Sequence, residues 1–156
     1  MESNGLYFKK IWEDDTIFEL KIEIKSSCAI SHVCCYVDKN LLNELKELAN
    51  QFLSERKSFT WCLSKKSDGN IDYTPYFSLC IDKIDLKGNI SVSIEMDNNK
   101  VDIEKMVCIT SIATEIGLFE QFLKRLNSFI REDIIEFDLL GNDTNGYQKD
   151  GAIVML

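Results

Sequence analysis

The chain has 156 residues, of which 45% are hydrophobic and 10% aromatic, a composition typical of one folded domain with an ordinary core. Its formal net charge of -8 argues against nucleic-acid binding, because the phosphate backbone favours clusters of Lys and Arg. No apolar run approaches the roughly 18 residues that a membrane-spanning helix needs. Residues 1–15 also lack the zones of a secretory signal. We therefore expect a cytoplasmic protein with no nucleic-acid or membrane partner.

Three strands are expected first, at residues 6–12, 17–25 and 29–37. In the second of them, apolar and charged residues alternate strictly, which predicts an antiparallel strand with one solvated face. Its apolar side is formed by Phe18, Leu20, Ile22 and Ile24. The third segment is more continuously apolar, so we expect it to lie in the centre of the sheet.

Residues 39–56 change to a helical period. The apolar positions fall three and four residues apart, with charged residues between them, which predicts an amphipathic helix. These positions are Leu41, Leu42, Leu45, Leu48, Ala49 and Phe52. Asp38 stands where an N-cap acceptor is expected.

Four further strands are expected in residues 59–113, separated by turn residues at 67–70, 86–89 and 98–99. A second helix is expected over residues 114–130, with Thr114 as its N-cap. Beyond it, residues 134–140 and 152–156 are compatible with either a terminal hairpin or a mobile tail.

The hairpin expected around residues 98–99, between the last two of these four strands, has a specific register. If Asn98 and Asn99 form a two-residue loop, the apolar side chains on both strands fall on one side of the ribbon, as a half-buried sheet requires. This register pairs Met96 with Val101, Ile94 with Ile103, Asp97 with Lys100, and Glu95 with Asp102.

The order is therefore three strands, a helix, four strands and a helix. Consecutive antiparallel strands with segregated helices predict the α+β class. We expect one antiparallel sheet of about seven strands with both helices packed on one face. Residues 1–156 are expected to form a single domain, in which 132–156 is the possible terminal hairpin or tail.

The segment "SHVCCYVD" contains the only histidine and two adjacent cysteines, and it raises the question of a metal or thiol site. On a strand, His32 and Cys34 share one face, whereas Cys35 points to the other. A zinc ion at His32 and Cys34 would need further ligands such as Cys62 or Cys80, and close ligand pairs are missing. A structural strand is the favoured interpretation, with no metal and no cofactor.

All six cysteines lie within or beside apolar runs, so we expect them to be reduced and packed in the core. A Cys34 nucleophile activated by His32 is disfavoured because buried thiols are usually inert. No glycine-rich phosphate loop, G-x-S-x-G elbow or H-E-x-x-H sequence is present. Carboxylates that meet in a cleft remain the alternative basis for an enzyme.

The expected register creates a candidate partner-binding site. It gathers acidic side chains on one face of the ribbon, and a like-charge pair such as Glu95 with Asp102 costs stability unless something offsets it. The residues of this face are Glu95, Asp97, Asp102 and Glu104. A docking face for a cationic protein is one interpretation. A solvated face with Lys100 and Lys105 as counterions, or a divalent-cation site, are the others.

Two segments, "FSLCIDKIDLKGNISVSIEMD" at residues 77–97 followed by "TEIGLFEQFLKRL" at residues 114–126, resemble small bacterial immunity proteins of the WapI type. The resemblance spans roughly residues 17–130 and is one of element order, so it assigns no functional residue. It implies a single α+β domain that neutralises the cognate toxin of a polymorphic or contact-dependent toxin system. The function expected from the sequence is therefore that of a non-enzymatic protein-binding module, with a cationic toxin domain as its partner.

Overall fold

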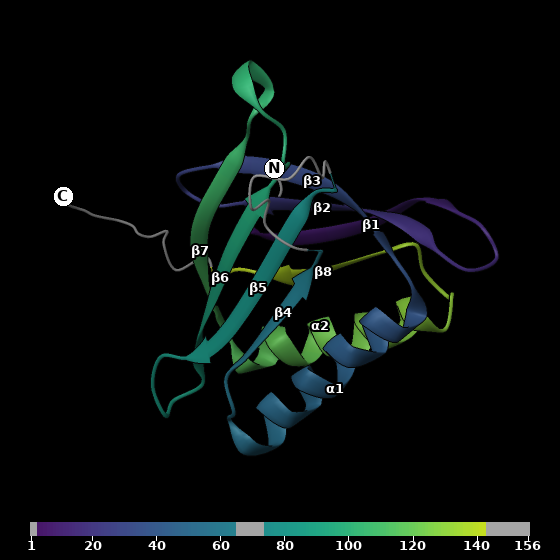
Figure 1. Ribbon diagram of the computed structural model, residues 1–156. Helices are drawn as coiled ribbons and strands as arrows, with labels where there is room; N and C mark the ends of the chain where they lie inside the picture. Colours follow the sequence, from purple (N-terminus) through teal and green to yellow (C-terminus); the bar gives the residue numbers. More distant parts are fainter. Residues whose placement is uncertain (1–2, 65–73, 143–156) are drawn as a thin grey trace.

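The strands of this protein form two antiparallel sheets of four strands each in a computed structural model, which describes residues 3–64 and 74–142 (Figure 1). One sheet has the order β3-β2-β1-β8 and the other β4-β5-β6-β7. The elements are β1 (Gly5–Glu13), β2 (Phe18–Lys25), β3 (Ile30–Val37), α1 (Lys39–Glu55), β4 (Phe59–Leu63), β5 (Tyr76–Lys83), β6 (Asn89–Asp97), a 3-10 turn (Asp102–Glu104), β7 (Val107–Glu115), α2 (Ile116–Ile130) and β8 (Glu136–Leu140).

The two sheets cross each other, and the two helices lie side by side below them in the view of Figure 1. Strand β3 contacts β5 and β6 of the other sheet. Helix α2 packs against α1, against β8 of the first sheet and against β7 of the second. Both sheets therefore share one hydrophobic core, and α2 joins them.

Alternation along the strands explains which face each one buries. The residues expected to face inward on β2 and β6 are all buried, and the residues between them are more exposed. Aromatic rings pack within and between the sheets: Phe8 of β1 stacks on Phe137 of the neighbouring strand β8, at 4.5 Å between ring centroids. An edge contact between Phe8 and Phe77 of β5 connects the two sheets.

Helix α1 begins as predicted. The Asp38 Oδ1 atom accepts a hydrogen bond from the Leu41 backbone N–H at 2.9 Å. The predicted cap of α2 is wrong, because Thr114 is fully buried on β7 and its hydroxyl donates to the Leu140 carbonyl at 2.6 Å. The N-cap position belongs to Glu115, whose side chain makes no capping hydrogen bond.

The α+β class, the antiparallel strands and the two helices are confirmed, but the strands divide into two sheets. The prediction that β3 lies centrally is wrong, because β3 is an edge strand. After β3 the chain leaves through α1 and starts the second sheet, while β8 returns to pair with the opposite side of β1. The predicted turn at 67–70 and the terminal strand at 152–156 lie outside the described residues.

The predicted register of the β6–β7 hairpin is also wrong. Strand β7 begins at Val107, so that Glu95 lies opposite Ile109 and Met96 opposite Cys108. Residues 98–106 form a loop instead of the start of a strand. The pairs Met96–Val101 and Glu95–Asp102 therefore do not form. The loop's own hydrogen bonds, described below, favour this longer connection.

No helix within residues 3–64 and 74–142 is long and apolar enough to cross a membrane.

The hydrogen bond between Thr114 and Leu140 yields a test of how the two sheets are joined. Replacing Thr114 with Val removes the donor and leaves the Leu140 carbonyl without it. We expect the free energy of unfolding to fall by about 1 kcal/mol, measured by urea denaturation. Thr114→Ser keeps the hydroxyl and serves as the control; equal stability of Thr114→Val and the wild type would contradict this role.

Candidate functional site

The candidate site begins with the loop of residues 98–106, whose backbone is held by the side chain of Asn98. The Asn98 Nδ2 atom donates to the Glu104 carbonyl at 2.7 Å. Its Oδ1 atom accepts from the backbone N–H groups of Lys100 at 3.1 Å and Met106 at 3.0 Å. One amide thus satisfies backbone groups on both sides of the loop, and this gives the loop a defined shape without strand pairing.

A buried carboxylate anchors the same loop to the end of β6. Asp97 is only 6% exposed, and its Oδ1 atom accepts hydrogen bonds from the Asn99 N–H at 2.7 Å and from Lys105 Nζ at 2.6 Å. Asn99 is buried with a φ of 53°, a left-handed conformation that asparagine tolerates better than most residues. Its Nδ2 atom donates to the Thr74 carbonyl at 2.6 Å. Asp97 therefore stabilises the loop.

The loop presents apolar side chains to solvent. Ile103 is 98% exposed and Val101 61% exposed, although both were expected to face the core. Between and beside them, Asp102 and Glu104 are exposed as well. The loop projects beyond the ends of the two sheets, at the top of Figure 1. It is therefore a pre-shaped projection with an apolar tip and acidic flanks.

Strand β7 continues the exposed apolar surface away from the loop. Ile109 is 72% exposed and Val107 is also exposed, on the face of the sheet turned away from the core. We call Val101, Ile103, Val107 and Ile109, with Asp102 and Glu104, the loop–edge surface. Large apolar residues grouped in this way typically mark interaction sites.

The structure separates the four acids of the predicted partner-binding face. Asp102 and Glu104 lie on the loop, whereas Asp97 is buried in the ion pair with Lys105. Glu95 is half-buried on the outer face of its sheet, between Ser78 and Ile109. The expected continuous acidic ribbon does not form, because the strands pair in a different register.

Sequence reasoning missed the apolar part of the loop–edge surface. Residues 97–105 read Asp-Asn-Asn-Lys-Val-Asp-Ile-Glu-Lys. Asp, Asn, Lys and Glu are all depleted in strands, so this composition favours a loop. The alternation of Val101 and Ile103 favours a strand instead. Had the loop-favouring composition been given more weight than this alternation, both side chains would have been predicted to lie outside the core.

The segment with the single histidine is a strand whose faces differ as predicted. His32 is exposed and Cys34 partly exposed on one face of β3, whereas Cys35 is buried on the other. Cys62 and Cys80 lie on β4 and β5 of the second sheet. Within residues 3–64 and 74–142, no three His, Cys, Asp or Glu residues are grouped to hold a metal ion.

All six cysteines are free thiols, but the expectation that they all fill the core is wrong. Cys35 is buried, whereas Cys28 and Cys62 are exposed. Cys28 lies in the turn between β2 and β3, and Cys62 faces outward from the edge strand β4. Cys28 therefore belongs to no strand, and Cys62 occupies one of the exposed positions that alternate with buried ones along β4.

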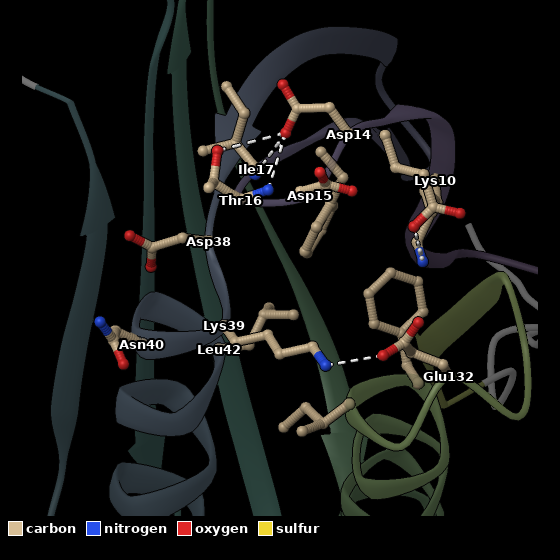
Figure 2. A pocket seen from close by; sticks show the side chains of 14 residues that line it. Lys10, Asp14, Asp15, Thr16, Ile17, Asp38, Lys39, Asn40, Leu42 and Glu132 are labelled. Carbon is tan, nitrogen blue, oxygen red and sulfur yellow. Dashed lines mark hydrogen bonds and ion pairs between the residues drawn. The ribbon is translucent and has the colours of Figure 1, made fainter.

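A cleft of about 690 Å³ lies where the turn between β1 and β2, the start of α1 and the end of α2 meet (Figure 2). Its two lysines are engaged: Lys10 bonds Glu13 at 3.1 Å and Lys39 bonds Glu132 at 2.7 Å. The Lys39 ammonium, through its hydrogen bond and charge, lowers the pKa of Glu132.

Two acids of this cleft serve local backbone structure. Asp14 accepts hydrogen bonds from the Ile17 and Thr16 N–H groups, and these bonds lower its pKa. Asp38 caps α1. The cleft thus joins three chain segments through paired charges and caps. None of these pairs brings a nucleophile and a base together, so the cleft gives the enzyme alternative no specific support.

The ion pair between Asp97 and Lys105 leads to a stability prediction. Lys105→Met removes the cation from a buried carboxylate, and we expect the free energy of unfolding to fall by about 1 kcal/mol in a urea titration. Lys100→Met, on the same exposed loop, is the matched control and should leave stability nearly unchanged. Equal effects of the two substitutions would show that the ion pair does not hold the loop.

The thiols differ in expected reactivity. Burial raises the pKa of Cys35 to about 12, so almost none of it is thiolate at pH 8, and its burial blocks access. Mass spectrometry after iodoacetamide treatment at pH 8 should find label on Cys28 and Cys62 and none on Cys35. Labelling of Cys35 in the native protein as fast as of Cys28 would contradict its place in the core.

No protein-family model, curated protein or solved structure matches this chain. The loop–edge surface gathers four exposed aliphatic side chains, two on a loop that is held by side-chain hydrogen bonds and two on the adjoining strand β7.

Proposed function

We propose that this chain is a non-enzymatic protein-binding module and that the loop–edge surface is its contact surface. The observation that carries the proposal is the almost complete exposure of Ile103 on a loop shaped by Asn98 and Asp97. A large apolar side chain in solvent gains free energy when a partner covers it. Because the loop is already ordered by its hydrogen bonds, little conformational entropy is lost on binding.

Charge supports a cationic partner. Asp102 and Glu104 flank the apolar tip, and the whole chain carries a net charge of -8. Complementary charge accelerates the encounter and aligns the partner. The apolar side chains at the tip supply affinity once the partner covers them. A basic surface with an apolar pocket is therefore the expected counterpart.

The resemblance of residues 17–130 to WapI-type immunity proteins supports a more specific proposal. In that case the partner is a toxin domain, and the chain neutralises it by stoichiometric binding. The proposed contact would cover a basic surface of the toxin. No chemical step is required of the chain, in agreement with a contact surface made of aliphatic and carboxylate side chains.

The test uses the full chain as bait in lysate from the organism that encodes it, followed by a binding titration with the purified protein that it retains. We expect this protein to be basic and to bind the Ile103→Asp variant at least about tenfold more weakly, a loss of about 1.4 kcal/mol. The double variant Asp102→Lys/Glu104→Lys should slow association and reduce its dependence on salt.

Leu86→Asp is the matched control, because Leu86 is 91% exposed in the turn between β5 and β6, away from the loop–edge surface. Equal binding by the Ile103→Asp and Leu86→Asp variants would contradict the assignment of the surface. Failure of the wild-type chain to retain a specific partner would contradict the proposed function itself.

A further inference from the structure

Strand β7 is the outer strand of its sheet (Figure 1), and within residues 3–64 and 74–142 no other strand pairs with its outward side. The Ala113 carbonyl accepts the Asn142 N–H at 2.6 Å, so the backbone groups of Ala113 point away from β6. The β6–β7 pairing has no register shift, and strand residues alternate in direction. Val107, Ile109 and Ser111 therefore also present N–H and C=O groups outward.

This edge lacks the features that usually prevent strands from pairing with other chains. Residues 107–113 read Val-Cys-Ile-Thr-Ser-Ile-Ala, with no proline and no charge. Natural edge strands are commonly protected by lysine, proline, a bulge or very short length. At the other edge of the same sheet, β4 has only 5 residues. Strand β7 is thus suited to pairing with an added strand.

Charges at both ends of the edge indicate which strand fits. Glu115 ends β7 on one side, and Asp102 and Glu104 lie in the loop before its other end. A second copy paired antiparallel about Ile109 would bring Glu115 opposite residue 103, between these two acids. Like charges would then meet at both ends of the ribbon, which is unfavourable. A strand with basic ends would meet opposite charges.

We propose that the edge of β7 accepts an extended segment of a protein partner as a fifth strand. The segment has apolar side chains at two alternate positions, beside Val107 and Ile109, and a basic residue near each end. Its backbone pairs with Val107, Ile109 and Ser111, which together offer about six hydrogen bonds. This inference rests on the proposed function and specifies the class of partner segment and its mode of binding.

A displayed library of random seven-residue peptides, selected on the immobilised full chain, tests the proposal. The enriched peptides should have alternating apolar residues and basic ends. On binding, amide hydrogen exchange should slow at Ile109 and Ser111 and change little at Cys108 and Thr110, whose N–H groups already face β6. Alternate protection of this kind distinguishes strand addition from contacts made by side chains alone.

Ser111→Pro removes one outward N–H without removing a bond to β6, and proline is tolerated at such edge positions. We expect it to weaken peptide binding about tenfold, the effect of about 1.4 kcal/mol. Ser111→Thr keeps the N–H and is the control. Unfolding curves of both variants verify that the sheet is intact. Should the proline variant fail to fold, peptides N-methylated at single positions and bound to the wild-type chain test the loss of one backbone hydrogen bond instead.

Several results would overturn strand addition: no enrichment, equal binding by the proline and threonine variants, or uniform protection along β7. Slow exchange at Ile109 and Ser111 in the free chain would show that the edge is already covered, by a second copy if the protection rises with concentration. These failures are separate from failure of the proposed function, which is decided by whether Ile103→Asp weakens binding of the retained partner protein.

Discussion

The buried carboxylate of Asp97 is the constraint on which the candidate site depends. It binds the Asn99 N–H and the Lys105 ammonium at the point where β6 ends, and Asn98 completes the frame of the loop. A tight turn at residues 98–99 would replace this arrangement. Because the loop closes only at Met106, β7 starts at Val107, and the pairing of every residue on β7 follows from that start.

The opposite end of β7 is fixed independently, by contacts with the segment that ends β8. The Thr114 hydroxyl bonds the Leu140 carbonyl and the Ala113 carbonyl bonds the Asn142 N–H. Strand β7 is thus held at both ends, while no other strand in the part of the chain that the structure describes pairs with the outward side of its middle. A protein-binding surface benefits from this combination, because its backbone groups and apolar side chains are ordered before a partner arrives.

Short-range sequence patterns predicted the strands, helices and cap that depend on interactions between residues close together in the chain. Strict alternation located β2 and β6, helical spacing located α1 and α2, and Asp38 was recognised as a cap. The division into two sheets depends on pairing between β1 and β8, more than a hundred residues apart in sequence, and no local pattern encodes it. The hairpin register failed because Val101 and Ile103 satisfied an alternation that the buried side chains of Asp97 and Asn99 overrule.

The register of β6 and β7 is therefore the central claim, and the α protons of the two strands test it directly. Residues 93 and 95 form pairs with 111 and 109 that do not exchange hydrogen bonds, and in such pairs the α carbons approach to about 4.5 Å. An NMR spectrum of the labelled protein should show nuclear Overhauser effects between the α protons of Glu95 and Ile109 and of Ser93 and Ser111. An effect between the α protons of Met96 and Val101 would instead establish the two-residue turn and contradict the account.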